Sequence, residues 1–596
     1  MPSHLAAATA FALACVIGGV SPAQSTDRDK TLRVAFPVAE TGFDPQVTSD
    51  VYSSAIISAI VDPLYVYDYF ARPVRMVPNT AAAMPEVTDE GRTYTIKVKP
   101  GIYFAADPAF KGRRRELTAD DYVYSIKRIF DPKVRSYWVY VFERNLVGLD
   151  DVLSAARKSG TLDYDTKIEG LQALDRYTLR IRFARPNYGF EWWFTTVYFS
   201  AVAREVVDAY KDSSNRVMEN PVGTGPYRLK SWTRGQHIVL EANPDYREVP
   251  FPAPGPGSAP ADAAIAKGLV GRRLPLVGTV DVSIVEEAQP LLLSFNSGKF
   301  DYVRVPPTLA SEVLRGSVLK PDYARRGVVL HRDLTPSISM YYFNFDHPLV
   351  GGYAPEKIAL RRAISMGFDR PARIAQLLDG QAQAANQPVP PPLYGHDPKY
   401  VAPYGFDPKS ARALLDKFGY KDRDGDGYRE LPDGKPLTLV LASTTDAAAR
   451  ISDELWKRSM DAIGLKITFL KNKWPELNRM SEAGQLMMWG FGWTSNIPEG
   501  IDFYSYFYSR NIGTSNDARM RLPTFDALYE KSRLLPDGPH RTALFGEMND
   551  MIFNYAPWIM TDYPYESFVA QPRLKGYKLN TFVQQQWQYL DVESTP

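Results

Sequence analysis

The sequence contains a single cysteine, Cys15, few histidines and no excess of either charge. Cys15 lies in an apolar N-terminal run, so a mature chain without that run has no disulfide, no thiolate nucleophile and no thiolate metal ligand. Lys plus Arg total 70 against 68 for Asp plus Glu, a net charge of +2, and this balance does not favour a nucleic-acid partner. The histidines are scattered along the sequence without i, i+4 pairing, which argues against a histidine metal site. We find no phosphate-binding glycine loop, no Gly-x-Ser-x-Gly and no His-Glu-x-x-His, so nothing indicates a cofactor or a standard catalytic motif.

The N-terminus has the pattern of an export signal. Residues 5–20 are apolar and uncharged. Ser21-Pro22-Ala23 follows and has the small-x-small pattern of a signal-peptidase cleavage site. We therefore expect residues 1–23 to be a signal peptide and the mature protein to be periplasmic. Ala12-Leu13-Ala14-Cys15 also resembles a lipoprotein signal, with Ala where Leu is usual, so lipidation at Cys15 is the alternative. The run is shorter than the roughly 20 residues that a membrane anchor needs.

The length of 596 residues predicts several folding units, because single cores stop growing at about 250–300 residues. Alternating apolar and polar residues predict strands at 31–36, 92–99, 177–183 and 237–242. Apolar spacing of i, i+3, i+4 predicts helices at 51–62, 118–130 and 357–380, the last of these broken at Asp369-Arg370-Pro371. From about residue 400 helices and strands alternate, which indicates an α/β unit.

One segment resembles a calcium loop. Asp422, Asp424 and Asp426 occupy alternate positions with Gly427 sixth, as at the start of an EF-hand loop. The twelfth position is Asp433 after Pro432, so the bidentate glutamate of that loop is missing. The alternative is a tight turn stabilised by aspartate side chains.

An aromatic segment lies near the C-terminal end, at residues 487–508, with the sequence MMWGFGWTSNIPEGIDFYSYFY. Two tryptophans, Trp489 and Trp493, each lie next to a glycine. Aromatic side chains give a large contact area at low entropic cost, and the indole N–H and phenol O–H groups add directional hydrogen bonds. The segment could be a buried strand followed by a loop, or it could be the wall of a ligand cleft.

Four further segments decide between these interpretations by resemblance. They are residues 91–104 (GRTYTIKVKPGIYF), 117–128 (LTADDYVYSIKR), 220–227 (NPVGTGPY) and 358–364 (IALRRAI). Together and in this order they resemble the solute-binding proteins of bacterial peptide-type ABC transporters, a family that includes dipeptide, oligopeptide and nickel binders. The resemblance extends from about Leu32 to Val592. The Asp422–Glu430 segment also recurs in that family, as a connection.

The resemblance implies an α/β protein with the two lobes of a type II (Venus-flytrap) periplasmic binding protein and an extra subdomain inserted in the first lobe. On this basis we expect lobe I to comprise residues 32–76, 205–305 and 555–592, the extra subdomain residues 77–204, and lobe II residues 306–554. The implied function is capture of a small peptide or another small organic solute between the lobes. An inner-membrane ABC permease is then the expected partner, and we expect a monomer.

The resemblance also suggests contact residues. Peptide binders of the family carry Gly-Trp-x-x-Asp, whose carboxylate pairs with the α-ammonium of the peptide, whereas here Gly492-Trp493-Thr494-Ser495 is followed by Asn496. An amide forms weaker hydrogen bonds to a cation than a carboxylate does, so we do not expect the ordinary α-ammonium contact of the peptide binders at this position. We expect Trp493 and Asn496 to contact the solute, with Trp489 behind them. Further candidates are Tyr342, Asn344, Phe43 and Asp44.

Two other functions are compatible with the sequence. An exported hydrolase could use a pair of carboxylates, for which Glu499 and Asp502 are the obvious candidates, or these residues could belong to a solvated turn. A periplasmic chaperone or chemoreceptor adaptor could be built on the same fold, because a fold does not determine a function.

Overall fold

The computed structural model describes residues 27–583 and 585–593. The predicted signal peptide and Cys15 lie outside these residues. Within the described ranges, no helix combines the length and the apolar character needed to span a membrane.

A mixed sheet runs through the whole molecule and contains twelve strands in the described part of the chain. Its order is β18 (Lys466–Lys471), β17 (Thr438–Ser443), β19 (Met488–Thr494), β15 (Ser337–Phe343), β20 (Trp558–Ala570), β11 (Tyr302–Arg304), β1 (Asp27–Phe36), β10 (Val277–Ile284), β9 (His237–Ala242) and β8 (Tyr227–Thr233). Two more strands, β14 (Val329–Leu334) and β16 (Ala382–Ala384), pair with β20. We call the part that contains β1 lobe I and the part that contains β15 and β19 lobe II.

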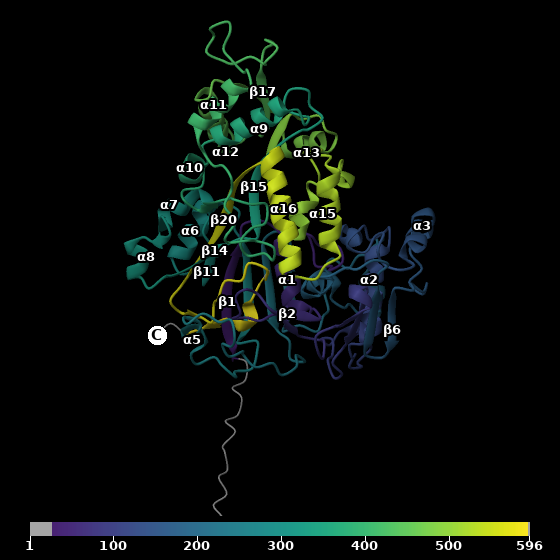
Figure 1. Cartoon of the computed structure of the whole chain (residues 1–596). Coiled ribbons are helices and arrows are strands. Elements are labelled where there is room, and N and C mark those ends of the chain that lie inside the picture. The colour runs from purple at the N-terminus through teal and green to yellow at the C-terminus, as the bar shows by residue number, and fades with distance from the viewer. Residues whose placement is uncertain (1–26, 584, 594–596) are drawn as a thin grey trace, which may run out of the picture.

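Two antiparallel segments connect the lobes. The first half of β20 pairs with β15 in lobe II, and its second half pairs with β14 and β11 in lobe I. β14 leads into β15 through Thr335 and Pro336, and the Thr335 N–H donates to the Pro564 carbonyl of β20 at 3.0 Å. In Figure 1, β20 descends from the upper part of the molecule to the lower part beside this crossing. The two lobes are therefore joined by neighbouring strands, an arrangement that permits hinge motion.

The crossing lies at a different position from the one we predicted. The sequence placed the exit from lobe I near residue 306, but the segment that follows continues to pack in lobe I. Val313, Tyr323 and Val328 share a buried cluster with Phe300 and Val569. This segment contains α7 (Ala310–Val313) and α8 (Pro321–Arg325), which lie beside α6 (Ala288–Asn296) on the left of Figure 1. We therefore place the crossing near residue 335.

A separate four-stranded sheet forms the core of the extra subdomain. Its order is β4 (Glu86–Thr88), β5 (Thr93–Lys97), β7 (Thr178–Arg182) and β6 (Leu171–Asp175). α2 (Ala119–Phe130) packs on β6 and β7, and α3 (Leu149–Ser159) lies at the outer end. The capping box that Thr118 and Asp121 form at the start of α2 confirms the predicted helix start.

Helices cover the lobe II strands. They are α9 (Pro355–Gly367), α11 (Pro408–Lys417), α12 (Ala447–Asp461), α13 (Trp474–Glu482), α14 (Ile501–Ser505), α15 (Pro523–Arg533) and α16 (Pro539–Tyr555). Leu360, Ile364, Trp456, Leu439 and Leu441 form one buried cluster between the helices and the sheet. The predicted break after α9 is confirmed, because that helix ends at Gly367 and a separate short helix begins at Arg370.

Candidate functional site

The aromatic segment contains β19, whose outer edge is mostly unpaired. β15 pairs with β19 along its whole length, from Met488 to Thr494, whereas β17 pairs with it at Met488 alone. Beyond Met488, β19 therefore has a free edge among the described residues. Gly492, Trp493 and Thr494 are exposed there. A free strand edge presents backbone donors and acceptors that can pair with another extended chain.

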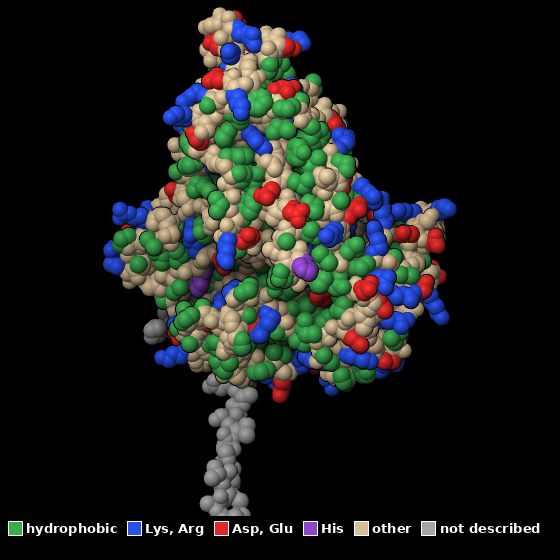
Figure 2. All heavy atoms as spheres, viewed as in Figure 1, with side chains coloured by type: hydrophobic (Ala, Val, Ile, Leu, Met, Phe, Trp, Pro, Cys, Tyr) green, Lys and Arg blue, Asp and Glu red, His purple; other side chains and the backbone are tan. Residues whose placement is uncertain are grey.

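Three cavities surround this edge. The large cavity, of about 1270 Å³, lies between lobe II and the extra subdomain and is bordered by Trp489, Trp493, Tyr506, Tyr137 and Tyr140. The central cavity, of about 540 Å³, lies where the lobes meet and is bordered by Phe36, Arg304, Trp493, Asn496 and Glu566. The lobe I cavity, of about 390 Å³, includes Tyr67, Tyr198, Asn496 and Gln586. In Figure 2 the surface is hollowed where the upper and lower parts meet, below the first residues of α16.

Trp493 and Asn496 lie at these cavities. Trp493 is 37% exposed, borders both the large and the central cavity, and packs edge-on against Tyr506 at 5.2 Å between ring centroids. Asn496 is exposed and borders the central and lobe I cavities. Trp489 is buried at 4% exposure and lies at the wall of the large cavity, beside Trp474. The structure thus brings these three predicted residues to one region, and their contact with a solute stays a prediction.

The other four predicted residues are buried in structural roles. Tyr342 is 1% exposed, and its hydroxyl bonds to the Ser481 hydroxyl at 2.7 Å. The Asn344 amide donates to the carbonyls of Gly484 and Leu486, each at 2.9 Å. Phe43 is fully buried against Trp232, at 4.6 Å between ring centroids.

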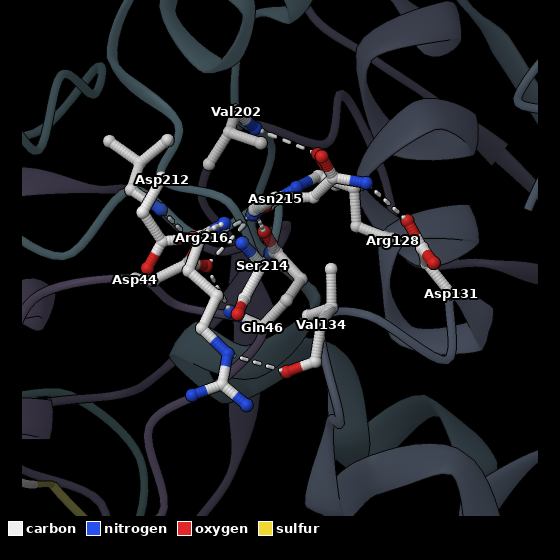
Figure 3. Close-up of polar contacts among 12 residues, drawn as sticks. Asp44, Gln46, Arg128, Asp131, Val134, Val202, Asp212, Ser214, Asn215 and Arg216 are labelled. Carbon is white, nitrogen blue, oxygen red and sulfur yellow. Dashed lines mark hydrogen bonds and ion pairs between the residues drawn. The ribbon is translucent and has the colours of Figure 1, made fainter. Parts of the chain in front are cut away.

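Asp44 is held in a buried ion pair with Arg128. Figure 3 shows the surrounding network, in which Gln46 and the loop that carries Asn215 also meet the Arg128 guanidinium. Neither Asp44 nor the other three residues borders the cavities described above. The structure therefore does not bring Phe43, Asp44, Tyr342 or Asn344 to these cavities, and their contact with a solute stays a prediction.

The pair of carboxylates considered for hydrolysis is not arranged as a pair in one cavity. Glu499 is buried and accepts a hydrogen bond from the Arg541 guanidinium at 3.0 Å. Burial raises its pKa to about 7, against the opposing pull of Arg541. Asp502 borders the large cavity, whereas Glu499 borders none of the three.

The acidic loop is compact. One carboxylate oxygen from each of Asp422, Asp424, Asp426 and Glu430 lies within 4.8 Å of the others. Asp422 already accepts backbone N–H groups from Gly425 and Gly427, at 2.7 and 3.0 Å, and Glu430 accepts from the Arg423 N–H at 2.8 Å. These bonds are those of an aspartate-stabilised turn. Calcium binding stays a prediction.

Several residues at the cavities were missed by the sequence reasoning. The amide nitrogen of Asn580 and the amide oxygen of Gln586 are buried without a hydrogen-bond partner in the described part of the chain, and both side chains border the central and lobe I cavities beside Asn496. Tyr137, Tyr140 and Trp474 are more than half exposed, at 58, 52 and 55%. Their aromatic character is visible in the sequence, but their convergence with Trp493 depends on the fold.

Comparisons with known proteins agree with this architecture. The chain is 24% identical over 569 residues to di/tripeptide-binding protein 2 of Pseudomonas aeruginosa, covering 92% of this chain and 93% of that protein. It is 23% identical over 503 residues to heme-binding protein A of Haemophilus influenzae, covering 83% and 81%.

Solved structures show the same two-lobed fold. The periplasmic binding protein DppA from Helicobacter pylori, in complex with the peptide STSA, matches with a TM-score of 0.68 at 19% identity over 95% of this chain and 98% of that one. NikA from Brucella suis, in complex with Fe(III)-EDTA, matches with a TM-score of 0.72 at 18% identity over 95% and 100%. The model of bacterial extracellular solute-binding proteins, family 5 Middle, matches residues 75–515, well over half of the sequence, and the chain belongs to this family.

Proposed function

We propose that the protein is the periplasmic receptor of a peptide-type ABC importer, which captures a small peptide or a similar organic solute between its lobes and delivers it to an inner-membrane permease. The free edge of β19 at the junction of the lobes carries this proposal. An extended solute can form backbone hydrogen bonds with this edge while its side groups enter the adjoining cavities. The names of the relatives, which include di/tripeptide-binding and oligopeptide-binding proteins, support a peptide cargo.

Two crossing strands make the site suitable for capture and release. A solute that touches both lobes stabilises the closed arrangement by its differential affinity for it. Trp493 on lobe II and Asn580 in lobe I border the same central cavity, so one solute can contact both. We propose that the receptor works as a monomer and that the permease recognises the closed arrangement of the two lobes.

Isothermal titration of the purified protein with di- to pentapeptides tests the proposal. We expect saturable one-to-one binding and a rise in melting temperature with peptide concentration, because a ligand of the folded state stabilises that state by mass action. Trp493→Ala should weaken binding, because the Trp493 ring borders both the central and the large cavity. Absence of binding across peptides of all these lengths, together with no co-purified solute by native mass spectrometry, would overturn the proposal.

A further inference from the structure

The large cavity combines exposed aromatic rings with carboxylates and contains no basic side chain among its described lining residues. Four carboxylates border it: Asp453, Glu482, Asp502 and Asp517. Asp453 is neutralised by an ion pair with Lys471. None of the other three forms an ion pair among the described residues. The cavity therefore presents net negative charge to whatever enters it.

Asp502 is the most available of these carboxylates. It is an exposed residue at the start of α14, and its carboxylate has no hydrogen-bond or ion-pair partner in the described part of the chain. Its exposure is to the cavity, and the protein around it raises the pKa of the carboxyl by desolvation, with Arg533 and Arg541 opposing. Arg541 is itself bonded to Glu499 and Asp537. A desolvated carboxylate without a partner gains strongly from a charge-assisted hydrogen bond.

Two hydroxyl groups orient the Asp517 carboxylate. The Ser481 hydroxyl donates to the Asp517 carboxylate at 2.6 Å, and the Tyr342 hydroxyl therefore donates to Ser481 at 2.7 Å, since the single Ser481 proton is already used. Burial raises the pKa of Asp517 to about 6. Tyr342 thus orients a carboxylate of the cavity without bordering it.

The opposite wall belongs to the extra subdomain and consists of aromatic rings. Tyr137 and Tyr140 lie on a single short turn, η3 (Tyr137–Val141), and are exposed. Between them, Trp138 is buried, stacks on Tyr198 at 3.7 Å between centroids and donates its indole N–H to the Thr48 carbonyl at 3.0 Å. This anchor fixes the turn, so the two rings face the cavity from a rigid support. On the lobe II side, Trp474 and Trp493 add two more exposed rings.

We infer that the large cavity binds a cationic group of the solute, an ammonium or guanidinium carried on a side chain, between the Tyr140 ring and the Asp502 carboxylate. This inference rests on the proposed receptor function and specifies the chemistry of its solute. The aromatic faces attract a cation through their quadrupoles, and Asp502 supplies the charge-assisted hydrogen bond. Because the two groups come from different parts of the molecule, a cation between them also favours closure.

Matched tripeptides test this inference by isothermal titration. Ala-Lys-Ala is compared with Ala-norleucine-Ala, which keeps the four-carbon chain of lysine and lacks the ammonium, and with Ala-Glu-Ala. We expect the lysine peptide to bind about 10- to 100-fold more tightly than the norleucine peptide, as is typical of a hydrogen bond to a charged group. Asp502→Asn should reduce this preference to about threefold or less, because the amide retains shape and loses charge.

Glu476→Gln is the matched control. Glu476 lies on α13, is paired with Arg479 on the surface and does not border the cavity. Its substitution by Gln changes the net charge by the same amount as Asp502→Asn, but away from the cavity. The preference should survive in this variant. Tyr140→Leu probes the cavity from the other wall and should also reduce the preference, so a folding defect in either cavity variant alone does not prevent the test.

A second probe tests whether the large cavity binds a cation independently of whether the protein binds peptides. Binding of n-butylguanidinium, with n-butanol as its neutral counterpart, can be followed by ligand-observed NMR. If no tripeptide binds while n-butylguanidinium binds in an Asp502-dependent way, the cationic cavity is supported and the peptide cargo is overturned. If all three tripeptides bind equally, the receptor stands and the cationic preference is overturned. If neither the peptides nor the cation binds, both are overturned.

Discussion

Arg128 and Asp44 form a fully buried, bidentate ion pair, with nitrogen–oxygen distances of 2.9 and 2.6 Å. Asp44 follows β1 in lobe I, and Arg128 lies on α2 of the extra subdomain, so the pair joins the two (Figure 3). The Val217 N–H donates to the same carboxylate at 2.8 Å, and the Arg128 guanidinium also donates to the Asn215 carbonyl at 2.9 Å. Both carboxylate oxygens of Asp44 and both terminal nitrogens of the guanidinium are hydrogen-bonded, whereas the Arg128 Nε is buried without a partner among the described residues.

Removing one partner of this pair should destabilise the protein strongly. Asp44→Ala leaves the Arg128 guanidinium buried without its counterion, and we expect a loss of about 3–5 kcal/mol in the free energy of unfolding. Chemical denaturation followed by circular dichroism measures the loss. Asp165→Ala breaks an exposed Asp–Arg pair of the same subdomain, whose atoms lie 2.8 Å apart, and should have little effect. Equal effects of the two substitutions would contradict the structural role of Asp44.

Two glycines of β19 should respond differently to alanine. A Cβ at Gly490 would overlap the Tyr341 ring, whereas at Gly492 the nearest atom would be the Ile338 carbonyl oxygen at 3.6 Å. We therefore expect Gly490→Ala to lower the melting temperature and Gly492→Ala to leave it nearly unchanged. Because Gly492 lies on the free edge and borders two cavities, its alanine variant should weaken peptide binding. Thermal melting and titration of both variants check this, and an unaltered affinity in Gly492→Ala would place the solute elsewhere.

The local structure was largely predictable from the sequence, whereas the site was predictable only in part. Alternation at residues 177–183 and the cap at Thr118 predicted β7 and α2 because these signals are local. β20 gave no such signal: it contains Pro564, which is tolerated at the crossing where the strand changes partners.

The contact residues show the same limit. Trp493 and Tyr342 lie on paired strands of similar composition, yet Trp493 is at the free edge and Tyr342 is buried between strands. No local pattern distinguishes these environments, since strand neighbours are set by pairing over long sequence distances. Tyr140 and Asp502 likewise meet at one cavity only because the extra subdomain folds against lobe II.

Folding stability should fall in acid because the half-buried His331 resists protonation in the folded state. His331 packs on Tyr577 at 4.4 Å between ring centroids, and burial lowers its pKa from 6.5 to about 4. Below pH 6.5 the unfolded chain takes up the proton and the folded chain does not, so stability is present above that pH and is lost as pH falls toward 4. From pH 7 to pH 5 we expect a loss of about 2 kcal/mol attributable to His331.

His331→Phe keeps a ring in contact with Tyr577 and removes the titration, so the free energies of unfolding at pH 7 and pH 5 should differ less in this variant. His540 is exposed, and His540→Asn should leave the pH dependence as in the unaltered protein. The same pH dependence in all three proteins would refute the assignment to His331.

Asn496 provides the most direct test of the solute's chemistry at the central cavity. It lies beside the amide nitrogen of Asn580 and the amide oxygen of Gln586, which have no hydrogen-bond partner among the described residues, so this end of the site presents neutral hydrogen-bonding groups. An uncharged end of the solute suits such groups, because it exchanges hydrogen bonds without leaving a charge unpaired.

In Asn496→Asp, a carboxylate replaces the amide. We expect peptides with a free α-ammonium to gain about tenfold in affinity over their N-acetylated forms, relative to the unaltered protein. Titration with Ala-Ala-Ala and acetyl-Ala-Ala-Ala measures the change. Asn554→Asp, at an exposed position whose side-chain oxygen already accepts a hydrogen bond from Arg362 at 3.0 Å, controls for the added charge. A preference that does not move in Asn496→Asp would show that the solute's end group binds away from this residue.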